Sequence, residues 1–520
     1  MRIDDAVGDC TVLVVGGSLT GLSAALFLAR YGVDCMVVEQ HTGTSVHPRG
    51  RLVSARSMEL FRSVGLEEDI RAIGEPGPMG FVLVDTLMDD HYGLMGDGRD
   101  ETRDVSPTGM WLCDQQLLEP LLLDRARQFG AEVHFGTRLV DFATDDDGLM
   151  VTLTTGERDV GTAPRRWTVR CDYLLAADGI RSGVREKLGI GRHGQGSLSR
   201  AVSAVFDADL APALRGRRVM AAICQGGGGM IWARGMPRAR LWQVGFPFAE
   251  GDDDPVRVGE RARDVARACT GLPDLSVQVR SAQAWETAAL VADRFSAGRV
   301  FLAGDAAHAM PPTGGLGGNT GIQDAHNLAW KLAAVVAGTG APALLDTYDA
   351  ERRPIADWTV AHALQWGGPQ PGRAATVQLG YRYPGLDTES GADRSLAENP
   401  FQPTGRPGTR VPHVSLVHHG ASGSTHDLLG AGFTLLAGAD GHVWETLPSP
   451  GTPVTVHRIG ADTPWRDVTG QFHRTFGIEP TGAALVRPDG FIGWRCPAAK
   501  SDAREQFESA LARLLGRTES

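Results

Sequence analysis

Residues 298–332 read GRVFLAGDAAHAMPPTGGLGGNTGIQDAHNLAWKL, and this stretch predicts how the rest of the chain is arranged. The apolar run up to Ala303 is bounded by glycine and predicts the end of a buried parallel strand, with Asp305 where the strand stops. Ligands bind beyond the carboxyl ends of such strands, so Asp305 is placed to accept hydrogen bonds from ligand hydroxyls. Five glycines between Gly314 and Gly321 then allow backbone N–H groups to approach a flat ring closely.

A helix is predicted to begin at about Gly317, because apolar residues recur at helical spacing from Ile322 to Ala333. Its N-terminus carries about half a positive elementary charge, which favours an anion beside the glycine loop. A reduced flavin, with negative charge at N1 and the C2 carbonyl, is the ligand we expect there, and Asp305 then suits the ribityl hydroxyls. The alternative is a glycine-rich loop that only turns the chain.

The length and composition are those of a globular protein with two or three domains. The 520 residues are 42% hydrophobic and 22% charged, with a formal net charge of −11. This acidic balance leaves no basic footprint for nucleic acid or for an anionic membrane. Seven cysteines are scattered without a CxxC pair or a Cys/His cluster at metal spacing, so we expect reduced thiols and no metal site.

The positions of the first strand and of the longest helix bear on where the protein works. The first strand is expected by Thr11, which leaves no room for a signal peptide, and Lys331 interrupts the longest apolar helix well short of a membrane span. We therefore expect a cytoplasmic protein with no membrane partner. The sequence is compatible with a homodimer but does not set the oligomeric state.

Residues 11–39 predict a βαβ unit with a dinucleotide-binding turn. Gly16 and Gly21 occupy the first and last glycine positions of the fingerprint, and Glu39 occupies the acidic position expected to reach a ribose. Ser18 replaces the middle glycine, and its small hydroxyl can still bind a phosphate. The fold class expected from this unit is α/β and Rossmann-like, but the turn alone does not separate FAD from NAD.

Basic and acidic residues follow the elements that come after this unit. Arg49 and Arg51 lie a few residues beyond the second strand and could reach a diphosphate or a ribose, with simple surface solvation as the alternative. A helix is predicted over Gln115–Gly130. Another apolar strand ends in Asp178 and a glycine, and two strand-end acids, Asp178 and Asp305, indicate a ligand edge more strongly than one.

Residues 199–285 alternate by twos between glycine-rich or charged turns and predict an antiparallel sheet, closed by an amphipathic helix over 255–270. Large apolar side chains of this sheet either line a pocket over the flavin or form the core of the layer. The candidates for the substrate pocket are Met230, Trp232, Trp242 and Phe246.

Three domains are expected. The FAD-binding and substrate-binding domains are each assembled from separate segments, namely 1–80, 110–190 and 290–365 for the first and 81–109 and 191–289 for the second. Residues 366–410, rich in Gly, Pro and Gln, are expected to form a long surface linker. Residues 411–520 alternate strands and helices and predict a thioredoxin-like domain. Because Cys496 is alone there, a structural or dimerising role is expected in place of a redox one.

With these features, the sequence resembles the class A flavoprotein monooxygenases, the family of para-hydroxybenzoate hydroxylase and phenol hydroxylase. The Gly16–Gly21 turn with Glu39, the Asp178-Gly179 pair and the Gly304-Asp305 pair match the three fingerprints of this family in order and spacing. The length and the C-terminal module without a dithiol look most like the branch that hydroxylates polycyclic aromatic polyketides and related antibiotics, near rifampicin monooxygenase.

The resemblance implies FAD as cofactor, NADPH or NADH as transient reductant, and roles for individual residues. Asp305 would hold the ribityl chain, and Asp178 would serve both FAD and the passage of NAD(P)H. The adenosine and diphosphate would be held by Thr20, Glu39, Arg49, Gln115 and the backbone near Leu139, and Pro312, Gly317, Gly318 and Asn319 would border the isoalloxazine. All the cofactor-binding residues expected are Gly16, Ser18, Thr20, Gly21, Glu39, Gln40, Arg49, Gln115, Leu139, Asp178, Gly304, Asp305, Pro312, Gly317, Gly318 and Asn319.

The resemblance also implies the reaction. NAD(P)H would reduce the flavin, O₂ would add at C4a, and an electron-rich phenol carbon would attack the distal oxygen of the hydroperoxide, while the protein supplies orientation and electrostatics. His308 and His326 are candidates for a base that acts on the phenol, but a structural role is favoured for each. A simple phenol hydroxylase, a Baeyer–Villiger oxygenase, a dehydrogenase and a flavin-loaded drug-binding protein are alternatives on the same scaffold.

Overall fold

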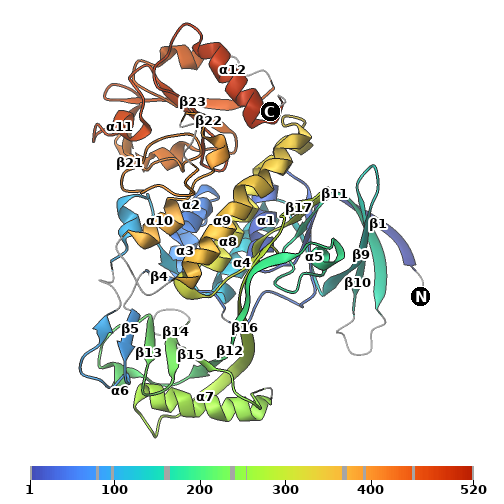
Figure 1. Ribbon diagram of the computed structural model, residues 1–520, viewed down its shortest axis with the longest axis vertical. Coiled ribbons are helices and arrows are strands. Elements are labelled where there is room, and N and C mark those ends of the chain that lie inside the picture. Colours follow the sequence, from blue (N-terminus) through green and yellow to red (C-terminus); the bar gives the residue numbers. More distant parts are fainter. Residues whose placement is uncertain are drawn as a thin grey trace.

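The strands of the protein form three large sheets and one small one. In the computed structural model, the described strands make two eight-stranded sheets, one seven-stranded sheet and one three-stranded sheet. Figure 1 shows the seven-stranded sheet at one end of the molecule and an antiparallel sheet with helix α7 at the other, with the long helices α8 and α9 between them. The described residues are 3–47, 49–77, 81–94, 99–156, 164–234, 240–252, 254–365, 372–389, 394–447 and 451–517.

The first eight-stranded sheet has a parallel core centred on the N-terminal strand. The order of its parallel strands is β8-β2-β1-β11-β18, so the order changes direction between β1 and β11, where ligands bind in doubly wound sheets. The predicted α/β class is confirmed. The strands are β1 (Ile3–Val15), β2 (Cys35–Glu39), β8 (Glu132–Phe135), β11 (Arg165–Ala176) and β18 (Val300–Leu302), with β9 (Thr137–Thr144), β10 (Leu149–Thr155) and β17 (Ser296–Ala297) added in antiparallel pairing.

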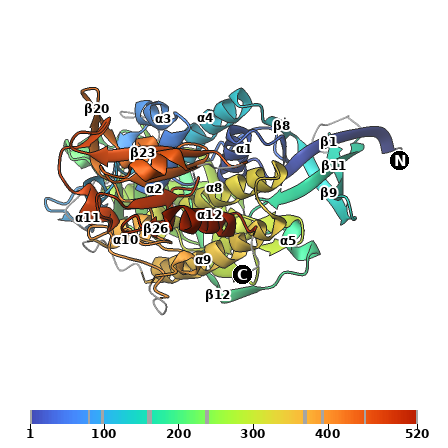
Figure 2. The same ribbon diagram turned by 90° about the horizontal axis from the view of Figure 1, so that it is seen from above.

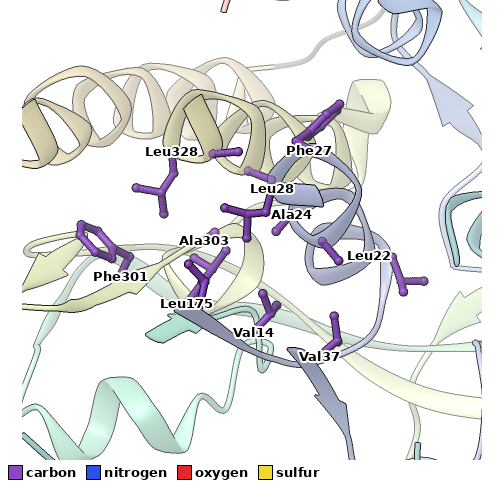
Figure 3. Close-up of a cluster of buried hydrophobic side chains, with 14 of the residues drawn as sticks. Val14, Leu22, Ala24, Phe27, Leu28, Val37, Leu175, Phe301, Ala303 and Leu328 are labelled. Carbon is purple, nitrogen blue, oxygen red and sulfur yellow. The ribbon is translucent and has the colours of Figure 1, made fainter. Parts of the chain in front are cut away.

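Helices α1 (Leu19–Arg30) and α8 (Leu316–Val336) stack on one face of this sheet. Figure 3 shows Leu28 of α1 between Leu328 of α8 and the strand residues Val14 and Leu175, while Phe27 points away from the strands. Every residue of α1 from Gly21 to Ala29 is buried, because this helix is covered by the sheet on one side and by α8 on the other. The helix predicted at Gln115–Gly130 is α4 (Gln115–Gln128).

The second eight-stranded sheet is antiparallel except where β13 runs parallel to β5. Its order is β19-β16-β12-β15-β14-β13-β5-β6, and α7 (Pro255–Thr270) covers one face. The predicted sheet and its closing helix are confirmed. The strands are β5 (Phe81–Val84), β6 (Gly93–Leu94), β12 (Arg192–Asp207), β13 (Ala221–Cys224), β14 (Gly229–Ala233), β15 (Leu241–Pro247), β16 (Gln278–Ala292) and β19 (His308–Ala309).

The C-terminal sheet has the order β21-β20-β24-β23-β22-β25-β26. Strand β22 is parallel to β23 and antiparallel to β25. Figure 2 shows this sheet, with α12 (Ala503–Leu514), lying over α2 (Ala55–Ser63) and α8. The strands are β20 (Ser415–His418), β21 (Ala421–Ser424), β22 (Phe433–Ala437), β23 (Val454–Gly460), β24 (Trp465–Asp467), β25 (Ala483–Val486) and β26 (Ile492–Cys496).

The segment before the C-terminal sheet is not a surface linker over its described parts, so that prediction is wrong. It contains helix α10 (Arg373–Leu379), and Tyr381 and Tyr383 are each only 2% exposed. Both rings pack against Phe491 of the C-terminal sheet. The apolar residues follow no period because they fill irregular gaps between elements, so the sequence pattern reads as a loop.

A hairpin of the C-terminal sheet is anchored among buried charges of the first domain. Arg487 donates to Glu351 of α9 (Thr347–Leu364) at 2.6 Å, and Lys331 of α8 donates to the same carboxylate at 2.8 Å. Asn327 donates to Asp489, in the turn of the hairpin, at 3.1 Å. Because Arg487, Lys331 and Asp489 are all buried, the C-terminal sheet and α8 are rigidly connected.

Candidate active site

The glycine-rich turn after β1 brings three elements together at the switch point. A Cβ on Gly16, whose φ is +107°, would lie 2.2 Å from the carbonyl oxygen of Ala177, just beyond β11. A Cβ on Gly21 would lie 1.8 Å from the carbonyl oxygen of Gly16. Only glycine therefore allows β1, α1 and the end of β11 to approach this closely. No side chain caps the N-terminus of α1, so its first N–H groups are available to an anion.

The acid at the end of β2 lies directly behind this turn. Glu39 is 8% exposed, and its carboxylate accepts from the backbone N–H of Gly17 at 2.7 Å and of His41 at 2.8 Å. Gln40 is exposed at the same strand end. Leu139 lies in β9, just after Gly136, whose N–H donates to the carbonyl of His41 at 2.8 Å. The structure thus brings together the predicted residues Glu39, Gln40 and Leu139.

The two strand-end acids emerge at the same edge of the sheet. Strands β11 and β18 pair in parallel, and Asp178 and Asp305 each follow within three residues of their ends. One carboxylate oxygen of Asp178 accepts from the N–H of Val184 at 3.2 Å, while Oδ1 is buried and has no partner among the described residues. Burial raises the pKa of Asp178, although Ser182 and Val184 oppose the shift.

Asp305 lies in an opening at this edge. Its side chain is exposed, although Gly304, Ala306 and Ala307 around it are buried. Protein surrounds the carboxylate on its other sides, so desolvation raises the pKa of Asp305, while the charges of His308 and Arg49 oppose the shift. Arg49 is exposed and close enough to act on Asp305. Over the described residues, neither Asp178 nor Asp305 forms an ion pair.

The N-terminus of α8 meets that of α1 at this edge. Thr20 of α1 is wedged between Gly304 and Gly321, where added Cβ atoms would lie 2.4 Å and 2.3 Å from its hydroxyl oxygen. No side chain caps the start of α8, and Pro312 and Gly318 are exposed while Gly317 is half-buried. The N-termini of two helices therefore lie at one edge of the sheet, which favours negative charge there.

Asn319 is used to hold a neighbouring segment. Its side chain accepts from the N–H of Ser54 at 2.9 Å and donates to the carbonyls of Leu52 at 2.8 Å and Gly315 at 2.6 Å. The amide is therefore committed to fixing the segment before α2 against the first turn of α8.

Gln115 and Ser18 meet at a residue that the sequence analysis missed. Gln115 donates to Ser18 Oγ at 3.0 Å and to Glu119 at 2.6 Å, and Ser18 Oγ donates to Glu119 at 2.7 Å. Glu119 is fully buried and also accepts from the N–H of Ser45 at 2.7 Å. A lone carboxylate inside the run LLEPLLL is the signal that could have identified it.

The four predicted substrate residues divide between the two faces of the second sheet. Trp242 and Phe246 pack in the hydrophobic cluster beneath α7, so for these two the pocket prediction is wrong and the core alternative holds. Met230 and Trp232 lie on the other face, because they are paired with Gly245 and Gln243, which alternate with the residues facing α7. The ring of Trp232 lies over Gly245, where a Cβ would approach it to 2.7 Å.

The two histidines considered as bases are both structural in their contacts. His308 is 1% exposed, and its Nε2 lies 2.7 Å from Asp324. His326 is 6% exposed and lies edge-on to Phe27, with ring centroids 4.6 Å apart. Burial, with Arg56 nearby, lowers the pKa of His326 to about 3. Both rings are therefore enclosed by protein, and neither is placed to accept a proton from a ligand.

Family models match nearly the whole chain. A model described as an FAD-binding domain matches residues 9–363, and a model described as the C-terminal part of aromatic-ring hydroxylases matches residues 404–518. Among the described residues, no helix is both long and apolar enough to cross a membrane.

Relatives and solved structures agree with these matches over their full lengths. The tetracenomycin A2 monooxygenase-dioxygenase of Streptomyces glaucescens is 41% identical, over 98% of this chain and 97% of that protein. The 4-methyl-5-nitrocatechol 5-monooxygenase of a Burkholderia species is 39% identical, with 97% of each chain covered. A crystal structure of aklavinone-11 hydroxylase with FAD and aklavinone superposes with a TM-score of 0.88 at 35% identity, covering 99% of this chain and 100% of that one.

Proposed function

This chain belongs to the FAD-dependent aromatic-ring hydroxylases, and on that premise we propose that it hydroxylates a polycyclic aromatic phenol of the polyketide type in antibiotic metabolism. It is an FAD-dependent monooxygenase. One observation carries the choice of substrate: the face of the second sheet opposite α7 bears Met230 and Trp232, and the same sheet exposes the large side chains Leu83 and Trp285.

The residues at the edge with the two strand-end acids fit FAD. Gly16 and Gly21 allow the close approach of β1, α1 and the end of β11 that forms the turn, Asp178 Oδ1 lacks a partner within the described chain, and Asp305 lies exposed in its opening. We assign Ser18, Thr20, Arg49 and Gln115 to the diphosphate side, Glu39, Gln40 and Leu139 to the adenosine, and Asp305 with Gly304 to the ribityl chain, and we assign Pro312, Gly317, Gly318 and Asn319 to the isoalloxazine border.

FAD, when bound, supplies electron transfer from NAD(P)H and the activation of O₂. The protein stabilises charge on the ring, orients the substrate and excludes water from the site. The N-terminal dipole of α8, at Gly317 and Gly318, stabilises negative charge at the ring by about 1 kcal/mol. Asp178 is placed to contact both FAD and the entering nicotinamide. The face bearing Met230 and Trp232 orients a flat substrate and excludes water.

The choice of substrate class rests on the size of the apolar face and on the relatives. Leu83 and Trp285, large side chains of the same sheet, are 38% and 37% exposed. The tetracenomycin and aklavinone enzymes are named for multi-ring compounds. A monocyclic catechol is the second candidate, because the nitrocatechol enzyme is almost as similar to this chain.

For the C-terminal module we propose a thioredoxin-like layout. Its strands β23, β22, β25 and β26 are adjacent in that order, with β25 antiparallel to both neighbours. Cys496 is buried and its thiol lies 3.2 Å from the carbonyl of Ala498, which supports a structural role. The domain division proposed for the chain is FAD-binding, substrate-binding and thioredoxin-like.

The test is NADPH and NADH oxidation by the flavin-loaded protein under ¹⁸O₂, with aklavinone and 4-methyl-5-nitrocatechol as probes and product mass as readout. We expect stimulated turnover with aklavinone and one labelled oxygen in the product. Stimulation by the catechol alone would replace the polycyclic assignment with the monocyclic one. A labelled lactone, unlabelled product or no stimulation by either probe would overturn the hydroxylase proposal.

A further inference from the structure

The described residues 45–47 and 49–54, which we call the junction segment, are held by the cofactor side of the protein. Its Ser45 N–H donates to Glu119 at 2.7 Å, and its Gly50 N–H donates to Gln115 at 3.3 Å. At its other end, the N–H of Ser54 donates to Asn319 on α8 at 2.9 Å. Glu119 and Gln115 both contact Ser18 in the glycine-rich turn. Both ends of the segment are therefore fixed to the edge assigned to FAD.

Near its middle, the junction segment places a histidine against the second eight-stranded sheet, which we call the substrate sheet. His47 is 6% exposed, with Nδ1 2.9 Å from Ser281 Oγ and Nε2 3.2 Å from Ser203 Oγ. Ser203 lies on β12 opposite Gly245, which in turn is opposite Met230, so His47 contacts the face that bears Met230 and Trp232. One imidazole thus bridges two neighbouring strands of the substrate sheet.

Residues close to His47 also lie near the substrate sheet and near the sheet edge that bears Asp178 and Asp305, which we call the cofactor edge. Two residues on, the charge of Arg49 opposes the rise in the pKa of Asp305. Arg51 donates to the carbonyl of Ala233 at the end of β14 and lies 3.7 Å from Asp114. The contacts of His47 with Ser203 and Ser281 therefore lie only two residues along the chain from Arg49.

We propose that His47 is a positioning residue that couples occupation of the substrate sheet to the cofactor edge, by holding the junction segment against Ser203 and Ser281. This inference rests on the proposed function. Burial, together with Arg49 and Arg234, lowers the pKa of His47 and keeps the ring neutral. A neutral ring has one N–H and one acceptor nitrogen, and a serine hydroxyl can pair with either one. The bridge is therefore satisfied on both strands at once.

The test compares the wild-type holoenzyme with His47→Ala, His47→Gln and the double variant Ser203→Ala/Ser281→Ala. The matched control is Ser199→Ala, an exposed serine of the same strand β12. The readouts are the ratio of NADPH oxidation with and without aklavinone, the hydrogen peroxide released per NADPH, and the FAD content.

His47→Ala is expected to lower the stimulation ratio about tenfold, equivalent to about 1.4 kcal/mol, and to release more peroxide while FAD content is unchanged. The serine double variant should show the same loss, and combining it with His47→Ala should add little, since both remove one bridge. His47→Gln keeps a donor and an acceptor and should restore part of the ratio. Ser199→Ala should match the wild type.

Two results would overturn this inference without affecting the proposed function. The first is a normal stimulation ratio in both His47→Ala and the serine double variant. The second is reduced FAD content and stability with a normal ratio, which would show that His47 has a purely structural role. If the wild-type enzyme itself is stimulated by neither aklavinone nor 4-methyl-5-nitrocatechol, the proposed function fails first and the inference falls with it.

Discussion

Carboxylates surrounded by protein are used in opposite ways at the C-terminal interface and at the cofactor edge. At the interface, burial alone would raise the pKa of Glu351, but Arg487 and Lys331 hold it well below its usual range. At the cofactor edge, burial raises the pKa of Asp178 and Asp305, which form no ion pair within the described chain. Acids neutralised by the chain itself hold domains together, whereas acids left without a cation are available for a ligand.

The largest effect is expected from removing a cation at the C-terminal interface, where the buried acids are paired. Arg487→Met leaves Asp489 without its cation and Glu351 with Lys331 alone. Removing one partner from a buried charge network costs about 3–5 kcal/mol, so the apparent Tm should fall by several degrees in calorimetry. Arg513→Met, at an exposed position on α12, is the control. An unchanged Tm would show that the interface charges hold nothing together.

Removing an acid that forms no ion pair should weaken FAD binding and leave the stability of the folded protein almost unchanged. Asp305→Ala is expected to weaken FAD binding roughly tenfold to hundredfold, since charge-assisted hydrogen bonds contribute about 1.5–3 kcal/mol. The Tm of the flavin-free protein should change little. Flavin fluorescence titration measures the first and thermal scanning the second, with Asp264→Asn on the exposed side of α7 as control. Equal FAD affinity in variant and wild type would contradict the assignment of Asp305.

Acid should weaken the interface through a buried histidine beside it. The folded pKa of His326 is about 3 against an ordinary 6.5, so only the unfolded chain takes up this proton between those values. Stability therefore falls as pH falls from 6.5 towards 3, by about 1.4 kcal/mol per pH unit and about 2 kcal/mol by pH 5. His326→Leu should lose that part of the acid sensitivity in Tm measured against pH. His134→Leu, at an exposed ring, should keep it.

The smallest effect is expected at the exposed rim of the same interface. Arg62 of α2 pairs with Asp427 of the C-terminal module at 2.8 Å, and both side chains are partly open to solvent. Arg62 also pairs with Glu67 at 2.6 Å, but Glu67 keeps its ion pair with Arg71 at 2.6 Å when Arg62 is removed. Water screens the partly exposed pairs, so Arg62→Met should cost only about 1 kcal/mol, and high salt should reduce that effect. A loss as large as that of Arg487→Met would mean that position in the interface matters more than burial.

Within the candidate site, sequence patterns identified the residues whose position depends on their own strand or turn. The turn at Gly16 and Gly21, the acid Glu39 and the strand-end acids Asp178 and Asp305 were all predictable, because each follows directly from its own strand or turn. The contacts of Glu119 and His47 were not, since each bonds to partners far away in the sequence, such as Ser18, Ser203 and Ser281, although the apolar run around Glu119 marks that residue as unusual. No local pattern indicates such partners.

The sequence by itself determined the α/β class, the glycine-rich turn, the two acids and the helix that follows Gly315, because these depend on backbone conformation and on local periodicity. Only the tertiary structure decided that Trp242 and Phe246 face α7 while Met230 and Trp232 lie on the opposite face of the sheet, and that residues around Tyr381 are buried. A strand alternates its side chains equally well in either orientation, so packing against other elements selects which face becomes the site.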